Sequence, residues 1–318
     1  MDALTVQFPE PGHVRLQSVP LAEPAAADIV IAVAHSGIST GTERLLYAGR
    51  MPAFPGLSWP LVPGYESVGT VIHAGPAATH QVGDWVFVPG GKGYEGAAAL
   101  FGGASSRILS ASERAVAVSR ELGARGALLA LAATAHHVLA EGPQTHPELI
   151  VGHGVFGQLL ARLIVALGSK PPVVWEKNAR RRHGAAGYAV IDPADDDCHA
   201  YQRICDASGD ISILDTLISR LGRQGQITLA GFYDQPARFD FPPAFMREVR
   251  LRICAEWLPA DLHAVAAMVN DGSLSLDGLI THHQPVANSA AAYAQAFSDD
   301  SCLKMILDWL PQGDHGAS

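Results

Sequence analysis

The sequence predicts an α/β protein in which a doubly wound parallel sheet follows a mostly β domain. Two patterns lead to this prediction: short apolar segments broken by Gly and Pro up to about residue 120, and strand-like segments alternating with helix-like segments over 121–257. The chain has 318 residues, more than one hydrophobic core usually serves. We therefore expect segments 1–120, 121–257 and 258–318. The last is too short to form a core alone, so it should return to complete the first domain.

The first segment has the strand and turn spacing of a barrel or sandwich, with turn pairs such as Gly83-Asp84 between its apolar runs. Its expected strands are residues 4–8, 29–34, 67–74 and 85–88. In the second segment we expect helices over 121–139 and 156–167. Its expected strands are 149–151, 173–175, 188–191, 203–206 and 226–230. After 257 we expect helices over 260–269 and from 289, and extended pieces at 279–281 and 304–307.

The composition is that of a folded globular protein, because 48% of the residues are hydrophobic and 17% are charged. The net charge of −9 repels phosphate backbones, so nucleic acid is not an expected partner. The start of the chain has no signal-sequence pattern, and no stretch approaches the roughly 20 apolar residues of a spanning helix. We expect a cytoplasmic protein without an integral membrane segment. The four cysteines have no metal-ligand spacing and are expected to be buried or half-buried free thiols.

A glycine-rich turn lies between an expected strand and an expected helix. Its sequence, GHGVFG at 152–157, has the G-x-G-x-x-G spacing of dinucleotide-binding turns. The first glycine permits the tight turn, the second lets the backbone approach a pyrophosphate, and the third allows close packing of helix and strand. The phosphates then bind at the helix N-terminus. The expected cofactor-binding residues are Gly152, Gly154, Val155, Phe156, Gly157, Glu176, Ser208 and Gly231.

Glu176 ends the next expected strand, roughly 20 residues beyond the last glycine. A carboxylate there accepts hydrogen bonds from both ribose hydroxyls and repels a 2′-phosphate, which favours NAD over NADP. Two alternatives stay open: Glu176 is a surface carboxylate without a role, or the basic cluster at 177–182 binds a 2′-phosphate instead of forming a solvated helix face. Ser208 and Gly231 follow later strands, at the ends where open parallel sheets bind ligands.

Several motifs are similar to those of the medium-chain dehydrogenase/reductase superfamily. The segment 63–71, PGYESVGTV, resembles the family pattern GHE-x-x-G-x-V, and 83–86, GDWV, resembles GD-x-V. The match continues through TAH at 134–136 and LITH at 279–282. The resemblance implies a GroES-like barrel domain, completed by the C-terminal segment, and a Rossmann domain that binds NAD. It also implies dimers or tetramers formed through an edge strand, here placed at 251–255, and we expect a homodimer.

Further segments, at 36–43, 61–69, 131–137 and 151–154, resemble one branch of this superfamily. Its members oxidise the 3-(1-hydroxyethyl) group of bacteriochlorophyllide a, or of its chlorin precursor, to an acetyl group in bacteriochlorophyll biosynthesis. The resemblance implies an NAD-dependent alcohol dehydrogenase whose substrate is a chlorin or bacteriochlorin pigment. Two alternatives remain: a zinc-free NAD(P)H-dependent enone or quinone reductase, and a non-catalytic nucleotide-binding relative.

The chain departs from the zinc-dependent members of the superfamily at their catalytic ligands. Ser39, Tyr65 and Ala133 stand at the positions of a Cys, a His and the third ligand. Two hydroxyls and a methyl group do not replace thiolate and imidazole around zinc, so we expect no bound metal. The alternative is a zinc site built from other groups, for which His136, His137 and Glu66 are the candidates.

Without zinc, a side chain must accept or relay the proton of the alcohol. The expected catalytic residues are Tyr65, Glu66, His136 and Thr42, and the expected substrate contacts are Ser39, Phe54, Trp59 and His137. Tyr65 either faces the substrate or fills the space of the missing metal. His136 has the pKa best suited to a base, unless it is an ordinary helix histidine. Glu66 and Glu43 are alternatively structural carboxylates, and the apolar loop 47–60 either walls the macrocycle or packs on its own barrel.

Overall fold

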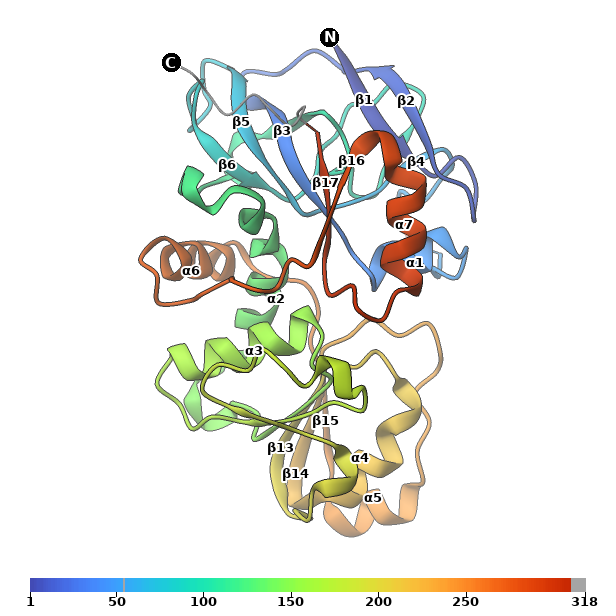
Figure 1. The fold of residues 1–318 in the computed structure, drawn as a ribbon, viewed down its shortest axis with the longest axis vertical. Helices are drawn as coiled ribbons and strands as arrows, with labels where there is room; N and C mark the ends of the chain where they lie inside the picture. Colours follow the sequence, from blue (N-terminus) through green and yellow to red (C-terminus); the bar gives the residue numbers. More distant parts are fainter. Residues whose placement is uncertain (54, 310–318) are drawn as a thin grey trace. The chain divides into compact units, whose positions relative to one another are not determined.

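The computed structural model describes residues 1–53 and 55–309 (Figure 1). Contacts between residues divide the chain into two units: unit 1 contains Met1–Ala130 and the chain from Asp277 onward, and unit 2 contains Leu131–Leu276. The domain boundaries that the sequence suggests, at 120 and 257, remain a prediction. Unit 1 is mostly β and unit 2 alternates strands with helices, which confirms the predicted fold class.

Unit 1 is built on a seven-stranded sheet with two smaller two-stranded sheets. The strands are β1 (Asp2–Gln7), β2 (Arg15–Pro20), β3 (Asp28–Ile38), β4 (Leu61–Val62), β5 (Ser67–Ala74), β6 (Trp85–Val88), β7 (Ala98–Ala99), β8 (Arg107–Ala111), β9 (Val116–Ala117), β16 (His282–Pro285) and β17 (Met305–Asp308), and the α-helices are α1 (Thr42–Tyr47) and α7 (Ser289–Ser298). The main sheet has the order β16-β17-β3-β5-β6-β9, and β8 also pairs with β3. Nine of the eleven residues of β3 are buried, because sheet neighbours and core cover this Val- and Ile-rich strand.

The last part of the chain completes this sheet, as the sequence predicts. β17 pairs antiparallel with β3, and β16 pairs parallel with β17 through the connecting helix α7. Tyr293 of α7 packs against Phe8 in the main core of unit 1, with ring centroids 5.2 Å apart. The extended piece expected at 279–281 is not a strand. The strand begins at His282 instead, where the backbone first runs alongside β17.

Unit 2 contains a six-stranded sheet in which all neighbouring strands are parallel. The strands are β10 (Leu149–Val151), β11 (Val173–Trp175), β12 (Ala189–Ile191), β13 (Tyr201–Asp206), β14 (Leu221–Leu229) and β15 (Arg250–Ile253), and the helices are α3 (Val155–Ala166), α4 (Leu214–Arg220), α5 (Phe241–Arg247) and α6 (Pro259–Asn270). The order is β12-β11-β10-β13-β14-β15, so it reverses between β10 and β13. Such sheets bind ligands beyond the carboxyl ends of their strands at this reversal.

The apolar stretch expected as one helix over 121–139 has two parts. Arg120–Leu128 is a 3-10 helix interrupted at Gly123, where φ is 49°, and α2 (Leu129–Leu139) follows it. Among the described residues, Arg120–Leu139 is the one helical stretch long and apolar enough, by length and composition, to cross a membrane. This finding corrects the expectation that no stretch approaches that length. In the most apolar part of this stretch, 56% is buried inside the fold. A core helix of a globular protein has the same length, composition and burial.

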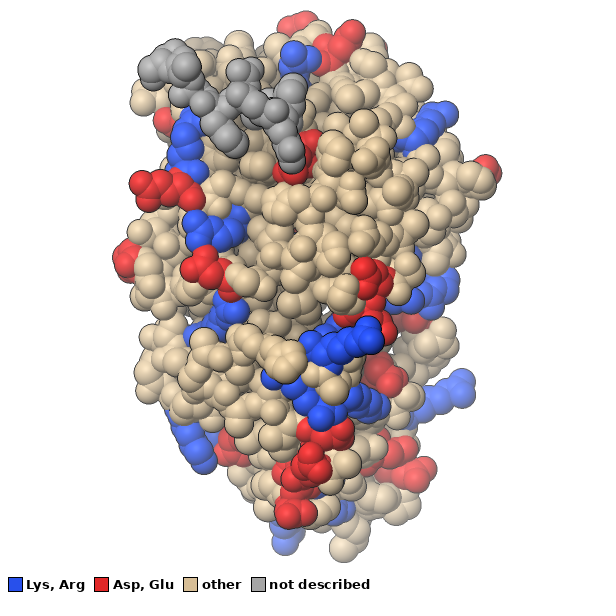
Figure 2. Space-filling view, viewed as in Figure 1, with Lys and Arg blue, Asp and Glu red and all other residues tan. Residues whose placement is uncertain are grey.

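The cysteines are free thiols, and three of the four are buried. Cys198 is exposed, contrary to the expectation, because it lies in the loop before β13. On the face shown in Figure 2, basic and acidic side chains lie next to one another with uncharged surface between them. The two signs of charge are therefore interspersed on that face.

Candidate active site

The glycine turn of unit 2 has the geometry that its three glycines predict. Gly152 has a φ of 98°, a left-handed conformation that favours glycine, and a Cβ there would lie 3.1 Å from the Cα of Ser208. A Cβ on Gly157 would lie 1.9 Å from the carbonyl oxygen of Gly152, so only glycine lets α3 begin this close to β10. A Cβ on Gly154 would meet nothing within 4 Å. The space beside Gly154 is therefore open to a ligand.

The N-terminus of α3 lies at this open space. Gly154 is its N-cap residue, and no side chain caps this helix end. The N–H groups of Val155 and Phe156 have no partner within the helix, because the first turn of every α-helix leaves such donors. Free N–H groups and the positive end of the helix dipole suit a phosphate. The donor set therefore fits the pyrophosphate of a dinucleotide.

Glu176 lies directly beside the glycine turn. One carboxylate oxygen, Oε2, accepts a hydrogen bond of 3.0 Å from the backbone N–H of His153, and Oε1 accepts one of 2.8 Å from the N–H of Asn178. The side chain is partly exposed. The carboxylate is thus held in one orientation at the turn, and it keeps lone pairs for further donors such as ribose hydroxyls.

The basic cluster after β11 is partly engaged within the protein. The Arg182 guanidinium donates to the carbonyl oxygens of Glu176 and Lys177, at 2.7 and 2.9 Å, and pairs with Asp192. Arg182 therefore stabilises its own loop. Lys177 and Arg180 are exposed and remain the basic groups through which this loop would reach a 2′-phosphate.

Ser208 and Gly231, predicted from the ends of later strands, lie near one buried carboxyl group. Asp206 ends β13, and its Oδ1 accepts a hydrogen bond of 2.9 Å from the N–H of Ser208. The Tyr233 hydroxyl donates to Oδ2 at 2.7 Å, and a Cβ on Gly231 would touch the Tyr233 ring at 3.2 Å. Burial raises the pKa of Asp206 above its ordinary value. The two predicted residues are thus brought together at the carboxyl edge of the sheet.

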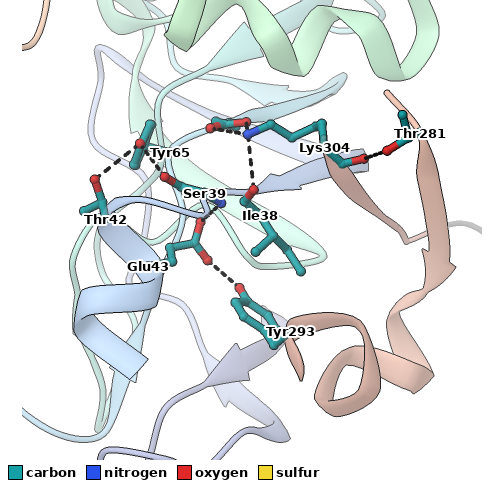
Figure 3. Close-up of polar contacts among 9 residues, drawn as sticks. Ile38, Ser39, Thr42, Glu43, Tyr65, Thr281, Tyr293 and Lys304 are labelled. Atoms are coloured by element: carbon teal, nitrogen blue, oxygen red, sulfur yellow. Dashed lines mark hydrogen bonds and ion pairs between the residues drawn. The ribbon is translucent and has the colours of Figure 1, made fainter. Parts of the chain in front are cut away.

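Unit 1 contains a cluster of three hydroxyl groups, shown in Figure 3. The Tyr65 hydroxyl lies 2.8 Å from Ser39 Oγ and 3.5 Å from Thr42 Oγ1. Ser39 follows β3, and Thr42 begins α1. Burial, reinforced by the charge of Glu66, raises the pKa of Tyr65 far above its ordinary value, so this phenol stays protonated. The structure therefore brings together Tyr65 and Thr42, which the sequence predicts as catalytic, and Ser39, which it predicts as a substrate contact, as hydroxyls able to donate and accept hydrogen bonds.

Glu66 is engaged in a buried ion pair with Lys304 of the last strand segment. Lys304 Nζ lies 2.9 and 2.7 Å from the two carboxylate oxygens and also donates to the carbonyl oxygen of Ile38 at 3.1 Å (Figure 3). Gly37 makes room for this pair, because a Cβ there would lie 2.3 Å from Glu66 Oε2. Both carboxylate oxygens already bind an ammonium group, which favours the structural alternative for Glu66.

Glu43 is a second buried carboxyl group close to the hydroxyl cluster. Its Oε1 accepts a hydrogen bond of 2.9 Å from the N–H of Ser39, and its Oε2 accepts one of 2.6 Å from the hydroxyl of Tyr293 (Figure 3). Burial raises the pKa of Glu43 to about 7, although both hydrogen bonds oppose the shift. Glu43 thus holds the end of β3 to α7.

His136 and His137 of α2 share one carboxylate in unit 2. The two Nδ1 atoms lie 2.7 and 2.8 Å from the two oxygens of Asp261. Burial alone would raise the pKa of Asp261, but the hydrogen bonds from Leu258, His136 and His137 bring it below its ordinary value. Because an ionised carboxylate only accepts, each Nδ1 carries the proton that it donates, and Nε2 is then the nitrogen of each ring that can accept a proton. An acceptor nitrogen oriented by a carboxylate is the arrangement of a general base.

The apolar loop of unit 1 is described in part. Trp59 and Leu57 pack against the main core of unit 1, and both are half-buried. This packing favours the alternative in which the loop covers its own barrel, and Trp59 as a whole stays partly exposed. Phe54, the other aromatic residue predicted to touch substrate, lies outside the described residues.

Comparison with known proteins identifies the family. Residues 25–143 match the alcohol dehydrogenase GroES-like domain. The chain is 54% identical, over 94% of its length and 96% of the relative's, to the 2-desacetyl-2-hydroxyethyl bacteriochlorophyllide A dehydrogenase of Cereibacter sphaeroides. The protein of the same name from Rhodobacter capsulatus is also 54% identical, over 91% of this chain and 92% of the relative. The chain belongs to the bacteriochlorophyllide dehydrogenase family, within the medium-chain dehydrogenases/reductases.

Solved structures confirm the fold of this dehydrogenase family member. A short chain alcohol dehydrogenase from Escherichia coli, solved with NADH, has a TM-score of 0.82 at 18% identity and covers 97% of this chain and 99% of its own. A zinc-binding dehydrogenase from Sinorhizobium meliloti, solved with NADP, has a TM-score of 0.80 at 18% identity, with coverage of 97% and 100%. The chain thus has the fold of dehydrogenases that bind either nicotinamide dinucleotide.

The donor set of this bacteriochlorophyllide dehydrogenase family member does not fit a catalytic zinc. Ser39 and Tyr65 present neutral hydroxyls to each other, and hydroxyls are poor zinc ligands. Within 1–53 and 55–309, no group of three or more His, Cys, Asp or Glu side chains could hold a metal ion.

Sequence reasoning missed three residues of these clusters. Lys304 has one local signal: it is a single charge at the start of an apolar strand, where a buried partner is required. Tyr293 and Asp261 have none, because each is more than a hundred residues from the group that it contacts.

Proposed function

We propose that this chain is a zinc-independent dehydrogenase that uses NAD to oxidise the hydroxyethyl group of a bacteriochlorophyllide to an acetyl group. The identity of 54% over 94% of the chain to a bacteriochlorophyllide dehydrogenase carries this proposal. When bound, the oxidised nicotinamide accepts the hydrogen of the alcohol carbon together with its electron pair. The hydroxyl proton is left to the protein, and the carbon–oxygen bond becomes the ketone of the acetyl group.

Unit 2 holds the dinucleotide. The open space beside Gly154 and the N–H groups of Val155 and Phe156 suit the pyrophosphate, and Glu176 accepts hydrogen bonds from the ribose hydroxyls. A fixed carboxylate also repels a 2′-phosphate, which supports NAD over NADP. Arg182 also supports NAD over NADP, because its guanidinium already donates to backbone carbonyl oxygens of its own loop instead of facing a 2′-phosphate.

The cofactor preference is tested by titrating the protein with NADH and NADPH and following nucleotide fluorescence. We expect NADH to bind at least tenfold more tightly than NADPH. In Glu176→Gln, the two dissociation constants should lie closer together. Glu148→Gln is the matched control, since Glu148 is a carboxylate of the same unit that precedes β10 and contacts Gln202 and Arg203. Equal affinities in the unchanged protein would contradict the proposal.

In unit 1, the Tyr65 hydroxyl binds the oxygen of the substrate alcohol and accepts its proton. Tyr65 passes its own proton on through the hydroxyl of Ser39 or of the partly exposed Thr42, and that hydroxyl in turn releases a proton to water. The short contact to Ser39 and the raised pKa of Tyr65 support this role, because a protonated phenol both donates and accepts. His136 is the second candidate for accepting the proton, supported by the hydrogen bond that orients its ring on Asp261.

The reaction is tested by mixing the protein, NAD and the hydroxyethyl pigment and recording the absorption spectrum. We expect NADH formation together with a red shift of the pigment band. The matched assay supplies NADPH and an enone or quinone. Reduction of the enone or quinone without oxidation of the pigment would favour a reductase, and tight NADH binding without either reaction would favour a nucleotide-binding relative.

We also propose a homodimer formed by the edge strand β15. Among the described residues β15 has one strand neighbour, β14, and its Ile253 side chain is 79% exposed. Met246 of the preceding α5 is 72% exposed. A second copy of β15 would bind the free backbone groups and cover these apolar side chains. Light scattering should give twice the chain mass, and Ile253→Lys should give monomers; a monomeric unchanged protein would contradict the proposal.

A further inference from the structure

His153, between the first two glycines of the turn, uses every polar group it has. Its backbone N–H donates to Glu176 Oε2 at 3.0 Å, and its carbonyl oxygen accepts from the Gln158 amide at 3.2 Å. Its ring nitrogen Nδ1 lies 2.6 Å from the carbonyl oxygen of Arg181, and Nε2 lies 2.9 Å from the hydroxyl of Tyr188. The residue is fully buried. An ordinary loop residue between two glycines needs none of these contacts.

The protonation of the ring follows from its partners. A carbonyl oxygen only accepts, so Nδ1 carries the proton and donates to Arg181. Burial lowers the pKa of His153, which keeps the ring neutral and leaves Nε2 as an acceptor for the Tyr188 hydroxyl. Tyr188 also accepts a hydrogen bond from Arg162 of α3. Its hydroxyl therefore bonds both the ring of His153 and the helix that follows the turn.

These bonds join three parts of the cofactor site. His153 belongs to the glycine turn, Arg181 and Tyr188 belong to the loop between β11 and β12, and Glu176 directly follows β11. Arg162 links α3 to the same network. Its guanidinium lies 3.4 Å from Gln158 Oε1, and the amide nitrogen of Gln158 donates to the carbonyl oxygen of His153. The ring of His153 contributes two of these links, and no other side chain of the turn replaces it, since the neighbours at 152 and 154 are glycines.

We propose that His153 is a positioning residue of the cofactor site, which locks the loop 177–188 and Glu176 to the glycine turn before the dinucleotide binds. The proposal rests on the proposed dinucleotide site. Without the imidazole, the loop and carboxylate must be ordered when the adenosine half binds, and that ordering lowers affinity. The hydride-transfer step is not affected, because His153 does not touch the reacting atoms.

The test compares NADH dissociation constants, measured by fluorescence without pigment. Tyr188→Phe removes only the hydroxyl, and His153→Asn keeps a donor for the Arg181 carbonyl but has no counterpart of Nε2. We expect each change to raise the NADH Kd by about five- to tenfold. The double variant should not exceed His153→Asn by more than about twofold, because both changes break the same bond. With saturating NAD, kcat should stay within about twofold of the unchanged enzyme.

The matched control is Tyr201→Phe. Tyr201 begins β13, at the opposite end of the strand from Asp206, and its buried hydroxyl donates to Asp196 at 2.8 Å. This change also removes one buried tyrosine hydrogen bond, and we expect lower thermal stability with an unchanged NADH Kd.

Unchanged NADH affinity in Tyr188→Phe and His153→Asn, with only the melting temperature lowered, would show a structural role and overturn the proposal. Effects that multiply in the double variant would also overturn it. If the unchanged protein binds NADH but does not oxidise the pigment, the proposed function fails while this test stands. If it binds neither nucleotide, both proposals fail.

Discussion

Lys304 Nζ lies 2.7 Å from Glu66 Oε2, although 238 residues separate them along the chain. The two side chains are 3% and 0% exposed, so water solvates neither charge. The carbonyl oxygen of Ile38 takes a further hydrogen bond from the ammonium group. Each charge therefore depends on the other, and removing one leaves a buried charge without compensation.

Lys304→Met should lower the free energy of unfolding by about 3–5 kcal/mol, because Glu66 stays buried without its partner. Urea unfolding followed by fluorescence measures the loss. Adding Glu66→Gln to Lys304→Met should recover part of it. Lys92→Met is the control, since Lys92 pairs with Asp28 at 2.9 Å but is 54% exposed, and it should cost under about 1 kcal/mol. Similar losses in both single variants would contradict the interpretation.

Glu43 should make the protein less stable as the pH rises. Its pKa is about 7 in the folded protein, against an ordinary value of 4.5 for an exposed glutamate, so the folded chain binds more protons between these values. The stabilisation by the protonated carboxyl is complete below about pH 4.5 and is lost as the pH rises through about 7, a change of about 3 kcal/mol. Unfolding of the unchanged protein and Glu43→Gln between pH 4.5 and 8 measures it. A stability difference between the two proteins that is independent of pH would refute the prediction. Glu148→Gln, which alters a half-exposed carboxylate, is the control and should leave the change of unfolding free energy with pH as it is in the unchanged protein.

Tyr65→Phe should lower kcat about a hundredfold, because the ring keeps its place while the hydroxyl that handles the proton is lost. NADH affinity should not change. Tyr94→Phe is the control within unit 1, because the buried Tyr94 hydroxyl donates to a backbone carbonyl oxygen, that of Gly102, at 2.7 Å. Pigment oxidation at saturating NAD measures both variants. Equal rates in the two would remove Tyr65 from the reaction.

His136 and His137 provide a matched pair, because each donates Nδ1–H to one oxygen of Asp261. If His136 accepts the alcohol proton, His136→Gln should lower kcat/KM about a hundredfold. His137→Gln should stay within about threefold of the unchanged enzyme. Equal losses in both variants would assign the pair a structural role through Asp261.

Much of the fold could be predicted from local sequence. The strands 149–151 and 173–175 were predicted with the bounds that the structure has, because buried parallel strands are short continuous apolar runs between turn residues. The turn at 152–157 was predictable because each of its three glycines is needed for a different reason: a left-handed backbone, open space for a ligand, or close packing of the helix. The break at Gly123 was not, since Ala- and Leu-rich flanks favour a continuous helix and only the backbone conformation shows the interruption.

The polar clusters were less predictable, because their partners come from distant segments. Glu66 and Glu43 are candidate bases beside Tyr65 by sequence, whereas their actual partners, Lys304 and Tyr293, are in the last part of the chain. The same holds for His136, whose orientation is set by Asp261. Local sequence identifies which residue types carry chemistry, and tertiary contacts decide which of them are already engaged.

The position of β17 in the sheet bears on how the chain is made. Unit 2 is continuous, so all its residues have been synthesised when Leu276 leaves the ribosome. Unit 1 still lacks the strand beside β3 at that moment, and its buried carboxylate lacks an ammonium group. A chain that stops before Lys304 therefore has an open strand edge and an uncompensated charge, both of which favour misfolding and degradation. Among the described residues, the last strand to be translated, β17, is the one that pairs with β3, and the lysine directly before it compensates the buried charge of Glu66.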